Sequence, residues 1–325
     1  MCKIAFIVLY FGKLPKNFPL WVESCKNNPE FDWLLFTDYV GGGDIDSCYQ
    51  LSPNIHVYKC TFAGIRERIQ SNFGFPISLD RPYKLCDYRP AYGSIFQKEL
   101  QSYDFWGYCD LDQVFGHLSD FLYGDVFESY DKIGQHGHLT LFKNKNPINQ
   151  AYKLYAPDCL SYREVFSTNI GKQFDEKPGI QKIFDFNGLK SYQNFVYADI
   201  STSRSQWTLT TFDSLPEDQK TTKCVYYYEN GRVYGFYDFG TQTKIIEYAY
   251  IHFSGRAPSP DIYMKSDMNG YFFKDDMVVP KMKNMNVSNS ECEKYNPYIF
   301  GKEVHHKIKR FISIQKRRIK KLITT

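Results

Sequence analysis

The chain has 325 residues, 43% hydrophobic and 23% charged, a balance that predicts a folded globular protein rather than a disordered one. Nine scattered cysteines without a C-x-x-C pair argue against a disulfide framework or a zinc ribbon and favour a reducing compartment. The net charge of +4 conceals a basic segment, 302–325, with nine Lys/Arg and one Glu, so 31 basic and 35 acidic residues precede it. This mildly acidic body gives no support to nucleic-acid binding.

Strand and helix patterns alternate through the first third of the chain. The apolar run after Met1 is too short to span a membrane and predicts a first core strand. The expected strands are 3–11, 31–38, 54–60 and 104–112, and the expected helices are 19–28, 61–74 and the residues that follow Pro90. Such alternation predicts parallel strands joined by crossover helices, and hence an α/β fold with a mostly parallel sheet.

The pattern loosens after residue 117. A strand is expected at 137–144 and helix at 147–170, and antiparallel strands are expected between 223 and 256, with Asn230-Gly231 as a hairpin turn. Residues 255–300 are rich in Pro, Asn, Lys and Gly and are expected to form loops. We therefore expect one catalytic domain over 1–301, followed by the basic tail 302–325.

Two aspartates, Asp110 and Asp112, follow the fourth expected strand in the stretch FWGYCDLDQVFG. Carboxylates at i and i+2 can share a divalent cation such as Mn²⁺ or Mg²⁺, which prefers oxygen ligands. Ligands of open α/β sheets bind beyond the carboxyl ends of the strands, where Asp38 also falls. The alternative is that both aspartates are solvated loop residues that cap the next helix.

Three further segments carry candidate residues. His252 ends an apolar run and is either a metal ligand or a core histidine, while the nearby Arg256 could hold phosphate oxygens. Lys84 could reach a phosphate and Asp87 a ribose or base, unless this segment is simply an exposed helix entry.

An acidic pair, Asp175 and Glu176, stands in a loop-like setting and could supply a general base. His136 and His138 could line an acceptor pocket, or they could be ordinary strand residues.

Five segments, taken in order, resemble bacterial polysaccharide-biosynthesis glycosyltransferases with the GT-A, nucleotide-diphospho-sugar transferase fold. They are 82–93, 103–122, 137–144, 174–176 and 250–256, and the resemblance covers roughly the first 260 residues. It implies a GT-A-like domain with a nucleotide-sugar-binding half, 1–117, and an acceptor-binding half, 118–301.

The resemblance also implies roles for the candidate residues. The metal ligands would be Asp110, Asp112 and His252. The residues that bind the nucleotide-sugar would be Tyr10, Phe11, Gly12, Asp38, Lys84, Asp87, Asp110 and Arg256. The enzyme would move a sugar from a nucleotide diphosphate donor, with a UDP-sugar as the expected donor, to a hydroxyl of a polysaccharide or lipid-linked glycan such as a capsule or O-antigen precursor. If the reaction inverts the anomeric configuration, Asp175 or Glu176 would deprotonate the acceptor.

The basic tail is expected to form an amphipathic helix, because apolar residues recur at near-helical spacing from Ile308 to Leu322. Such a helix could attach a cytoplasmic enzyme to the anionic inner face of a bacterial membrane. The alternative is a solvated or disordered tail.

The sequence is also compatible with two rival functions. A phosphatase or phosphotransferase of the haloacid dehalogenase type also has D-x-D-x-V after a strand, with Asp110 as nucleophile and Asp112 as general acid. That family usually carries its motif on the first strand, whereas here a long α/β pattern precedes it. The other rival is a non-catalytic carbohydrate-binding protein that uses the abundant aromatic residues, 18% of the chain, as stacking platforms.

Overall fold

The computed structural model describes residues 2–39, 45–194, 196–260, 268–274 and 277–297. The predicted helix of the basic tail lies outside these residues. The chain divides into two compact units. Unit 1 comprises Met1–Leu111 and Leu118–Phe195, and unit 2 comprises Asp112–His117 and Val196–Thr325. The segment 118–195 therefore belongs to the same unit as the N-terminal residues. The functional division into a nucleotide-sugar-binding half, 1–117, and an acceptor-binding half, 118–301, stays a prediction.

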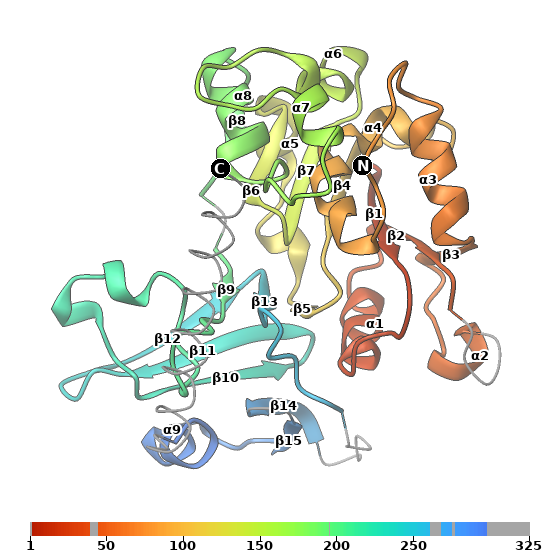
Figure 1. Ribbon diagram of the computed structural model, residues 1–325. Helices are drawn as coiled ribbons and strands as arrows, with labels where there is room; N and C mark the ends of the chain where they lie inside the picture. Colours follow the sequence, from red (N-terminus) through yellow and green to blue (C-terminus); the bar gives the residue numbers. More distant parts are fainter. Residues whose placement is uncertain (1, 40–44, 195, 261–267, 275–276, 298–325) are drawn as a thin grey trace. The chain divides into compact units, whose positions relative to one another are not determined.

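Unit 1 is built on a seven-stranded mixed sheet, with strand order β3-β2-β1-β4-β7-β6-β8 (Figure 1). Its strands are β1 (Ile4–Tyr10), β2 (Phe31–Thr37), β3 (Ile55–Lys59), β4 (Phe105–Cys109), β6 (Lys132–His136), β7 (Leu139–Lys143) and β8 (Ser191–Tyr192). The pairs β3–β2, β2–β1 and β1–β4 are parallel, and β7 runs antiparallel to both β4 and β6. The predicted α/β class, with a mostly parallel sheet flanked by helices, is confirmed.

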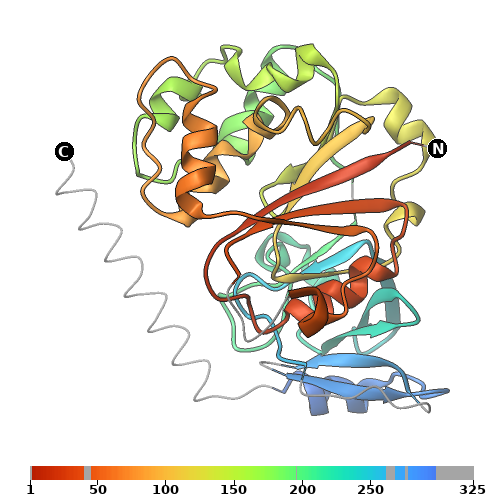
Figure 2. The ribbon, with the colours of Figure 1, turned by 90° about the vertical axis from the view of Figure 1, so that its right-hand side faces the viewer.

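The sheet of unit 1 is buried on both faces. Successive residues of a strand point to opposite sides of the sheet, and both sets of side chains are packed against other elements. On one face Ile7 belongs to a core cluster that includes Ile65 and Ile69 of α3. On the other face Phe6 stacks on Trp33, whose ring meets the edge of Trp21 in α1. Figure 2 shows β1 and β2 running side by side in this sheet. Burial on both faces explains why these strands read as nearly continuous apolar runs.

The helical segments of unit 1 are short. The α-helices are α1 (Phe18–Lys26), α2 (Ile45–Tyr49), α3 (Phe62–Gln70), α4 (Tyr92–Ile95), α5 (Gly124–Ser129), α6 (Asn146–Asn149), α7 (Tyr162–Phe166) and α8 (Lys182–Phe186). The 3₁₀ turns are η1 (Pro82–Ala91), η2 (Leu118–Asp120) and η3 (Ala151–Lys153), and η4 (Lys177–Gln181) is a π turn. Among the described residues, no helix combines the length and apolar character needed to cross a membrane.

Unit 2 contains two sheets. An antiparallel sheet of order β12-β11-β10-β14-β15 packs against α9 (Asn289–Tyr295) through a cluster that includes Phe272 and Tyr295. Its strands are β10 (Cys224–Glu229), β11 (Arg232–Asp238), β12 (Thr243–Tyr248), β14 (Met268–Lys274) and β15 (Met277–Met282). The second sheet has the order β5-β13-β9, with β5 (Gln113–Phe115), β13 (Tyr250–His252) and β9 (Ala198–Asp199). Two 3₁₀ turns complete the unit, η5 (Phe212–Ser214) and η6 (Glu217–Gln219).

Three local predictions differ from the structure. The helix expected after Pro90 is regular only over α4, and beyond it the chain continues as turns whose side chains, such as Phe96, are packed into the core. The helix expected over 147–170 is broken into short pieces around Pro157, where Asp158 has φ +54°.

The segment 255–300, expected to be loops, contains β14, β15 and α9. The strand β14 pairs antiparallel with the neighbouring β10, and this partner is supplied only by the fold. The helix α9 begins with a capping box of Ser288 and Glu291, a signal that was present in the sequence and that the loop-like composition obscured.

Gly107 in β4 offers a test of the sheet geometry. A Cβ at this position would overlap the Thr140 carbonyl oxygen of β7, so one of the two strands would have to shift. We expect Gly107→Ala to lower the free energy of unfolding by about 1 to 3 kcal/mol, measured by thermal and chemical denaturation. Gly124→Ala is the matched control, because a Cβ at that helix position meets nothing within 4 Å. Equal stabilities for the two variants would contradict the β4–β7 packing.

Candidate functional site

The carboxyl ends of β2, β1 and β4 lie next to one another in the sheet of unit 1. Chain connections run from β1 toward β2 and β3 on one side, and β4 lies on the other side, so a topological switch point falls between β1 and β4. Ligands of such sheets bind in the crevice outside the strand ends at this point. Asp110 directly follows β4, and Gly12 and Asp38 follow β1 and β2. The fold of unit 1 therefore brings three predicted residues to one edge.

Direct contacts join the ends of β1 and β2. The Gly12 N–H donates a hydrogen bond of 2.7 Å to Asp38 Oδ1, and Gly12 has φ +95°, a conformation that glycine adopts easily. The Tyr10 hydroxyl donates to the Lys13 carbonyl at 3.2 Å, and the Phe11 ring packs edge-on against Phe62. This loop is thus held in place by its own polar and aromatic contacts.

Arg89 joins two of the candidate carboxylates within unit 1. Its guanidinium donates to Asp110 Oδ1, to Asp175 Oδ2 at 3.0 Å and to the Gly137 carbonyl at 2.7 Å. It also lies over the Tyr108 ring, 5.3 Å from the ring centroid. One planar cation with several donors can hold two carboxylates in fixed orientations, which a lysine could not do as well. The sequence alone gives no specific role to Arg89, which lies in the same segment as Lys84 and Asp87.

Asp175 is almost fully buried, with 3% of its surface exposed. Burial raises its pKa, and although Arg89 opposes this effect, the pKa is raised to about 7. A carboxyl group that titrates near neutral pH suits general acid–base chemistry. Its neighbour Glu176 is half-buried, and the Glu176 carbonyl accepts the Gly179 N–H at 3.0 Å.

Asp112 and His252 meet in unit 2, although they are far apart in the sequence. Asp112 Oδ1 lies 3.4 Å from His252 Nε2, and Asp112 Oδ2 accepts the Gly255 N–H at 2.9 Å. Burial raises the pKa of Asp112, but the contacts with His252 and the Gly255 N–H outweigh it and lower the pKa below its ordinary value. These contacts favour the ionised carboxylate, the form that binds a cation.

A tight turn after β13 creates the contact between Gly255 and Asp112. Ser254 and Gly255 have φ of +51° and +82°, and the Arg256 N–H donates to the Phe253 carbonyl at 2.9 Å, which are features of a type I′ turn. The turn directs the Gly255 N–H at the Asp112 side chain, and the Phe253 N–H binds the Asp112 carbonyl at 2.9 Å. The Ser-Gly pair in the sequence HFSGR is thus explained by backbone geometry.

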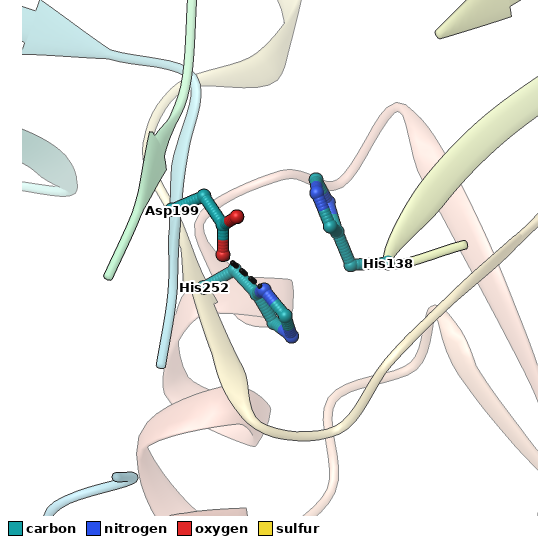
Figure 3. Close-up of side chains that lie close together, drawn as sticks. All are labelled: His138, Asp199 and His252. Carbon is teal, nitrogen blue, oxygen red and sulfur yellow. Dashed lines mark hydrogen bonds and ion pairs between the residues drawn. The ribbon is translucent and has the colours of Figure 1, made fainter. Parts of the chain in front are cut away.

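Asp199 was missed by the sequence analysis. Its Oδ1 lies 2.7 Å from His252 Nδ1, the hydrogen bond drawn in Figure 3. The parallel pairing of β9 with β13 places Asp199 directly opposite His252. A lone aspartate in VYADIS carries no motif, so only the strand register could have identified it.

The donor set around His252 suits a divalent cation. A carboxylate oxygen and an imidazole nitrogen are ligands that Mn²⁺ and Zn²⁺ accept, and Mg²⁺ takes the carboxylate. Two adjacent ligands of an octahedral cation with bonds near 2.1 Å lie about 3 Å apart, close to the observed 3.4 Å. Asp110 precedes Asp112 by two residues, so chain connectivity keeps their Cα atoms within about 7 Å. Its membership in the same metal site stays a prediction.

Lys84 and Asp87 form a buried ion pair of 2.7 Å. The Lys84 ammonium also donates to the carbonyls of Val165 at 2.9 Å and Ile170 at 3.0 Å, so its three donors are used. Asp87 accepts the backbone N–H groups of Lys172 and Phe174, each at 2.9 Å. Burial lowers the pKa of Lys84 despite its contact with Asp87. Since these contacts already occupy both side chains, we leave them out of the proposed donor site.

Arg256 has a similar bracing arrangement in unit 2. Its guanidinium donates to the carbonyls of Ser201 and Arg204, both at 3.0 Å, and of Ser205 at 2.7 Å. These bonds brace the loop over 201–205, so Arg256 is also left out of the proposed donor site. The rings of His136 and His138, weighed as acceptor-pocket residues, stack with centroids 5.1 Å apart.

The chain belongs to DUF6625, a family of unknown function, whose model matches residues 6–294. No curated protein matches the sequence. Solved structures with a similar fold include the glycosyltransferase GlyE of Streptococcus pneumoniae TIGR4, in its apo form, with 13% identity and a TM-score of 0.34. That match covers 59% of this chain and 45% of GlyE, so the chain spans less than half of that protein.

A second similar structure is the apo form of mouse xyloside xylosyltransferase 1. It is 9% identical with a TM-score of 0.36, and the match covers 62% of this chain and 88% of that protein.

The Lys84–Asp87 pair can be tested by removing the cation. We expect Lys84→Met to lower the free energy of unfolding by about 3 to 5 kcal/mol, because Asp87 would remain buried without its counter-ion. Chemical denaturation measures this change, and the exposed Lys190→Met is the control. If Lys84→Met instead kept wild-type stability and lost affinity for nucleotides, the phosphate role predicted from the sequence would be restored.

Proposed function

We propose that this protein is a metal-dependent glycosyltransferase that moves a sugar from a nucleotide diphosphate donor to a hydroxyl of a glycan. The observation that carries the proposal is the contact between Asp112 and His252, the second carboxylate of the D-x-D motif and the histidine that ends β13. A carboxylate and an imidazole in this arrangement are suited to a cation that holds a diphosphate. When bound, the cation would stabilise the negative charge that develops on the leaving diphosphate.

The edge of the sheet in unit 1 supports a nucleotide site in this proposal. Asp38 would accept a hydrogen bond from the ribose or base, and the glycine at position 12 leaves room for a close backbone approach. Tyr10 and Phe11 would bound the site on the β1 side. Asp110, held by Arg89, would bind a hydroxyl of the donor or share the cation. The donor sugar and nucleotide base are to be found by screening, with a UDP-sugar as the first candidate.

For the acceptor we propose Asp175 as the general base. With a pKa of about 7, a large fraction of the Asp175 side chains is deprotonated at physiological pH and able to accept a proton. The half-buried Glu176 would contact the acceptor without taking its proton. This assignment requires an inverting reaction, in which the base takes the proton from the attacking hydroxyl. A lipid-linked or polysaccharide acceptor, cytoplasmic location and attachment of the 302–325 tail to an anionic membrane remain predictions from the sequence.

The haloacid dehalogenase reading is less well supported by the contacts of Asp110. That reading needs Asp110 as a nucleophile, and the ion pair with Arg89 lowers the nucleophilicity of the carboxylate. A screen of nucleotide-sugars for metal-dependent hydrolysis, run beside hydrolysis of p-nitrophenyl phosphate, separates the two functions. Phosphatase activity without nucleotide-sugar turnover would reject the transferase. Glycan binding that needs neither metal nor nucleotide would favour the non-catalytic rival.

Asp112 provides the most direct test of the metal site. We expect Asp112→Asn to lower Mn²⁺-dependent turnover of the donor at least 100-fold and to weaken Mn²⁺ binding measured by calorimetry, because an amide is a weaker ligand than a carboxylate. Circular dichroism should show that the variant remains folded. The exposed Asp125→Asn is the matched control. Full activity and full Mn²⁺ affinity in Asp112→Asn would refute the assignment.

The raised pKa of Asp175 predicts how the transfer rate depends on pH. A general base acts in its deprotonated form, so the transfer rate should rise with pH through a midpoint near 7, the pKa of this group. We expect Asp175→Asn to lower kcat by about 10² to 10⁴ and to remove this rise. Glu176→Gln should retain both the midpoint and most of the rate. Loss of activity in Glu176→Gln, with a normal Asp175→Asn enzyme, would reverse the two roles.

A further inference from the structure

Among the described residues, Asp112 and Asp199 both pair with His252, and the proposed function gives no role to Asp199. It belongs to β9 and is half-buried, and its position is fixed by pairing with the central strand of the three-stranded sheet. No motif in the sequence points to it. Its contacts nevertheless define a specific relation to the imidazole.

Both Asp199 oxygens are hydrogen-bonded within unit 2. Oδ1 lies 2.7 Å from His252 Nδ1 and accepts the Ser254 hydroxyl at 2.9 Å, while Oδ2 accepts the Thr210 hydroxyl at 2.9 Å. The Thr210 N–H also binds the Asp199 carbonyl at 2.8 Å. The carboxylate is therefore held in one orientation by groups on both sides, with Oδ1 facing the imidazole.

This orientation selects one form of the neutral imidazole. An ionised carboxylate can only accept a hydrogen bond, so the proton of His252 must be on Nδ1 when Asp199 faces that nitrogen. The lone pair then belongs to Nε2, the nitrogen that lies 3.4 Å from Asp112 Oδ1. Metal-binding histidines commonly use a second carboxylate in this way, because it fixes the tautomer and makes the other nitrogen more basic.

We infer that Asp199 is a positioning residue that holds His252 in the Nδ1–H tautomer and so presents Nε2 to a divalent cation. This inference deepens the proposed function, and the part of the inference that concerns metal binding rests on that function. In this arrangement Asp199 acts on the cation through the imidazole, while Ser254 and Thr210 hold its carboxylate in place. The hydrogen bond between Asp199 and His252 involves only side chains of this protein, so its presence can be tested without a metal.

The first experiment determines the tautomer of His252 in the metal-free full-length protein by ¹⁵N NMR of labelled histidine side chains at pH 8.5. The spectrum of His252→Gln assigns the signals. We expect wild-type His252 to be protonated on Nδ1. We expect Asp199→Asn to move the population toward the Nε2–H form, because the charged acceptor is lost. Thr210→Val should leave the tautomer nearly unchanged, since Thr210 contacts the other oxygen.

The second experiment measures Mn²⁺ binding by calorimetry in the same proteins. We expect Asp199→Asn to weaken the affinity 10- to 100-fold. The exposed Asp218→Asn, a charge-matched control in unit 2, should bind as tightly as the wild type. Circular dichroism confirms that each variant is folded, and the wild-type spectrum tests the inference even if Asp199→Asn does not fold.

The outcomes separate this inference from the proposed function. An Nε2–H tautomer in the wild type, or an unchanged tautomer in folded Asp199→Asn, overturns the positioning role. Unchanged Mn²⁺ affinity in Asp199→Asn, with a shifted tautomer, overturns its link to metal binding. If the wild type has the Nδ1–H tautomer and binds no Mn²⁺, the metal site of the proposed function fails while the hydrogen-bonded arrangement of Asp199 and His252 stands.

Discussion

The cost of burying a carboxylate constrains the arrangement of residues around the candidate site. An unpaired buried charge costs several kcal/mol, so each acidic side chain there requires a partner. Arg89 serves both Asp110 and Asp175, and Asp112 is matched by His252 and a backbone N–H. These partners come from distant parts of the chain, so the contacts that offset the charge also position the carboxylates within each unit.

The structure separates residues that could act on a ligand from residues that hold the scaffold. Lys84 and Arg256 are alike in the sequence as cations that could reach phosphate oxygens. In the structure their donors are directed at backbone carbonyls, where they stabilise loops. Asp38, by contrast, lies half-buried at a strand end beside a glycine turn. The hydrogen-bond partners of a charged side chain therefore indicate whether it binds a ligand or holds a loop better than its local sequence does.

Much of unit 1 could be predicted because its signals are local. Apolar runs gave the first four strands, and the alternation of strand and helix predicted their parallel pairing. The strands β14 and β15 were missed because their stability depends on pairing with β10, while the segment itself is rich in residues typical of loops. Helix lengths failed for a related reason, since core packing and prolines shortened segments that have helical spacing.

The sequence by itself determined that a pair of aspartates follows a buried strand and that a histidine ends another, since strand ends can be read from local patterns. Only the tertiary structure decided that Asp112 meets His252, that Arg89 joins Asp110 to Asp175, and that Asp199 faces the imidazole. These contacts join residues separated by long stretches of chain, and strand register and turn geometry set them. A one-residue shift in the β9–β13 pairing would turn Asp199 to the other face of its sheet.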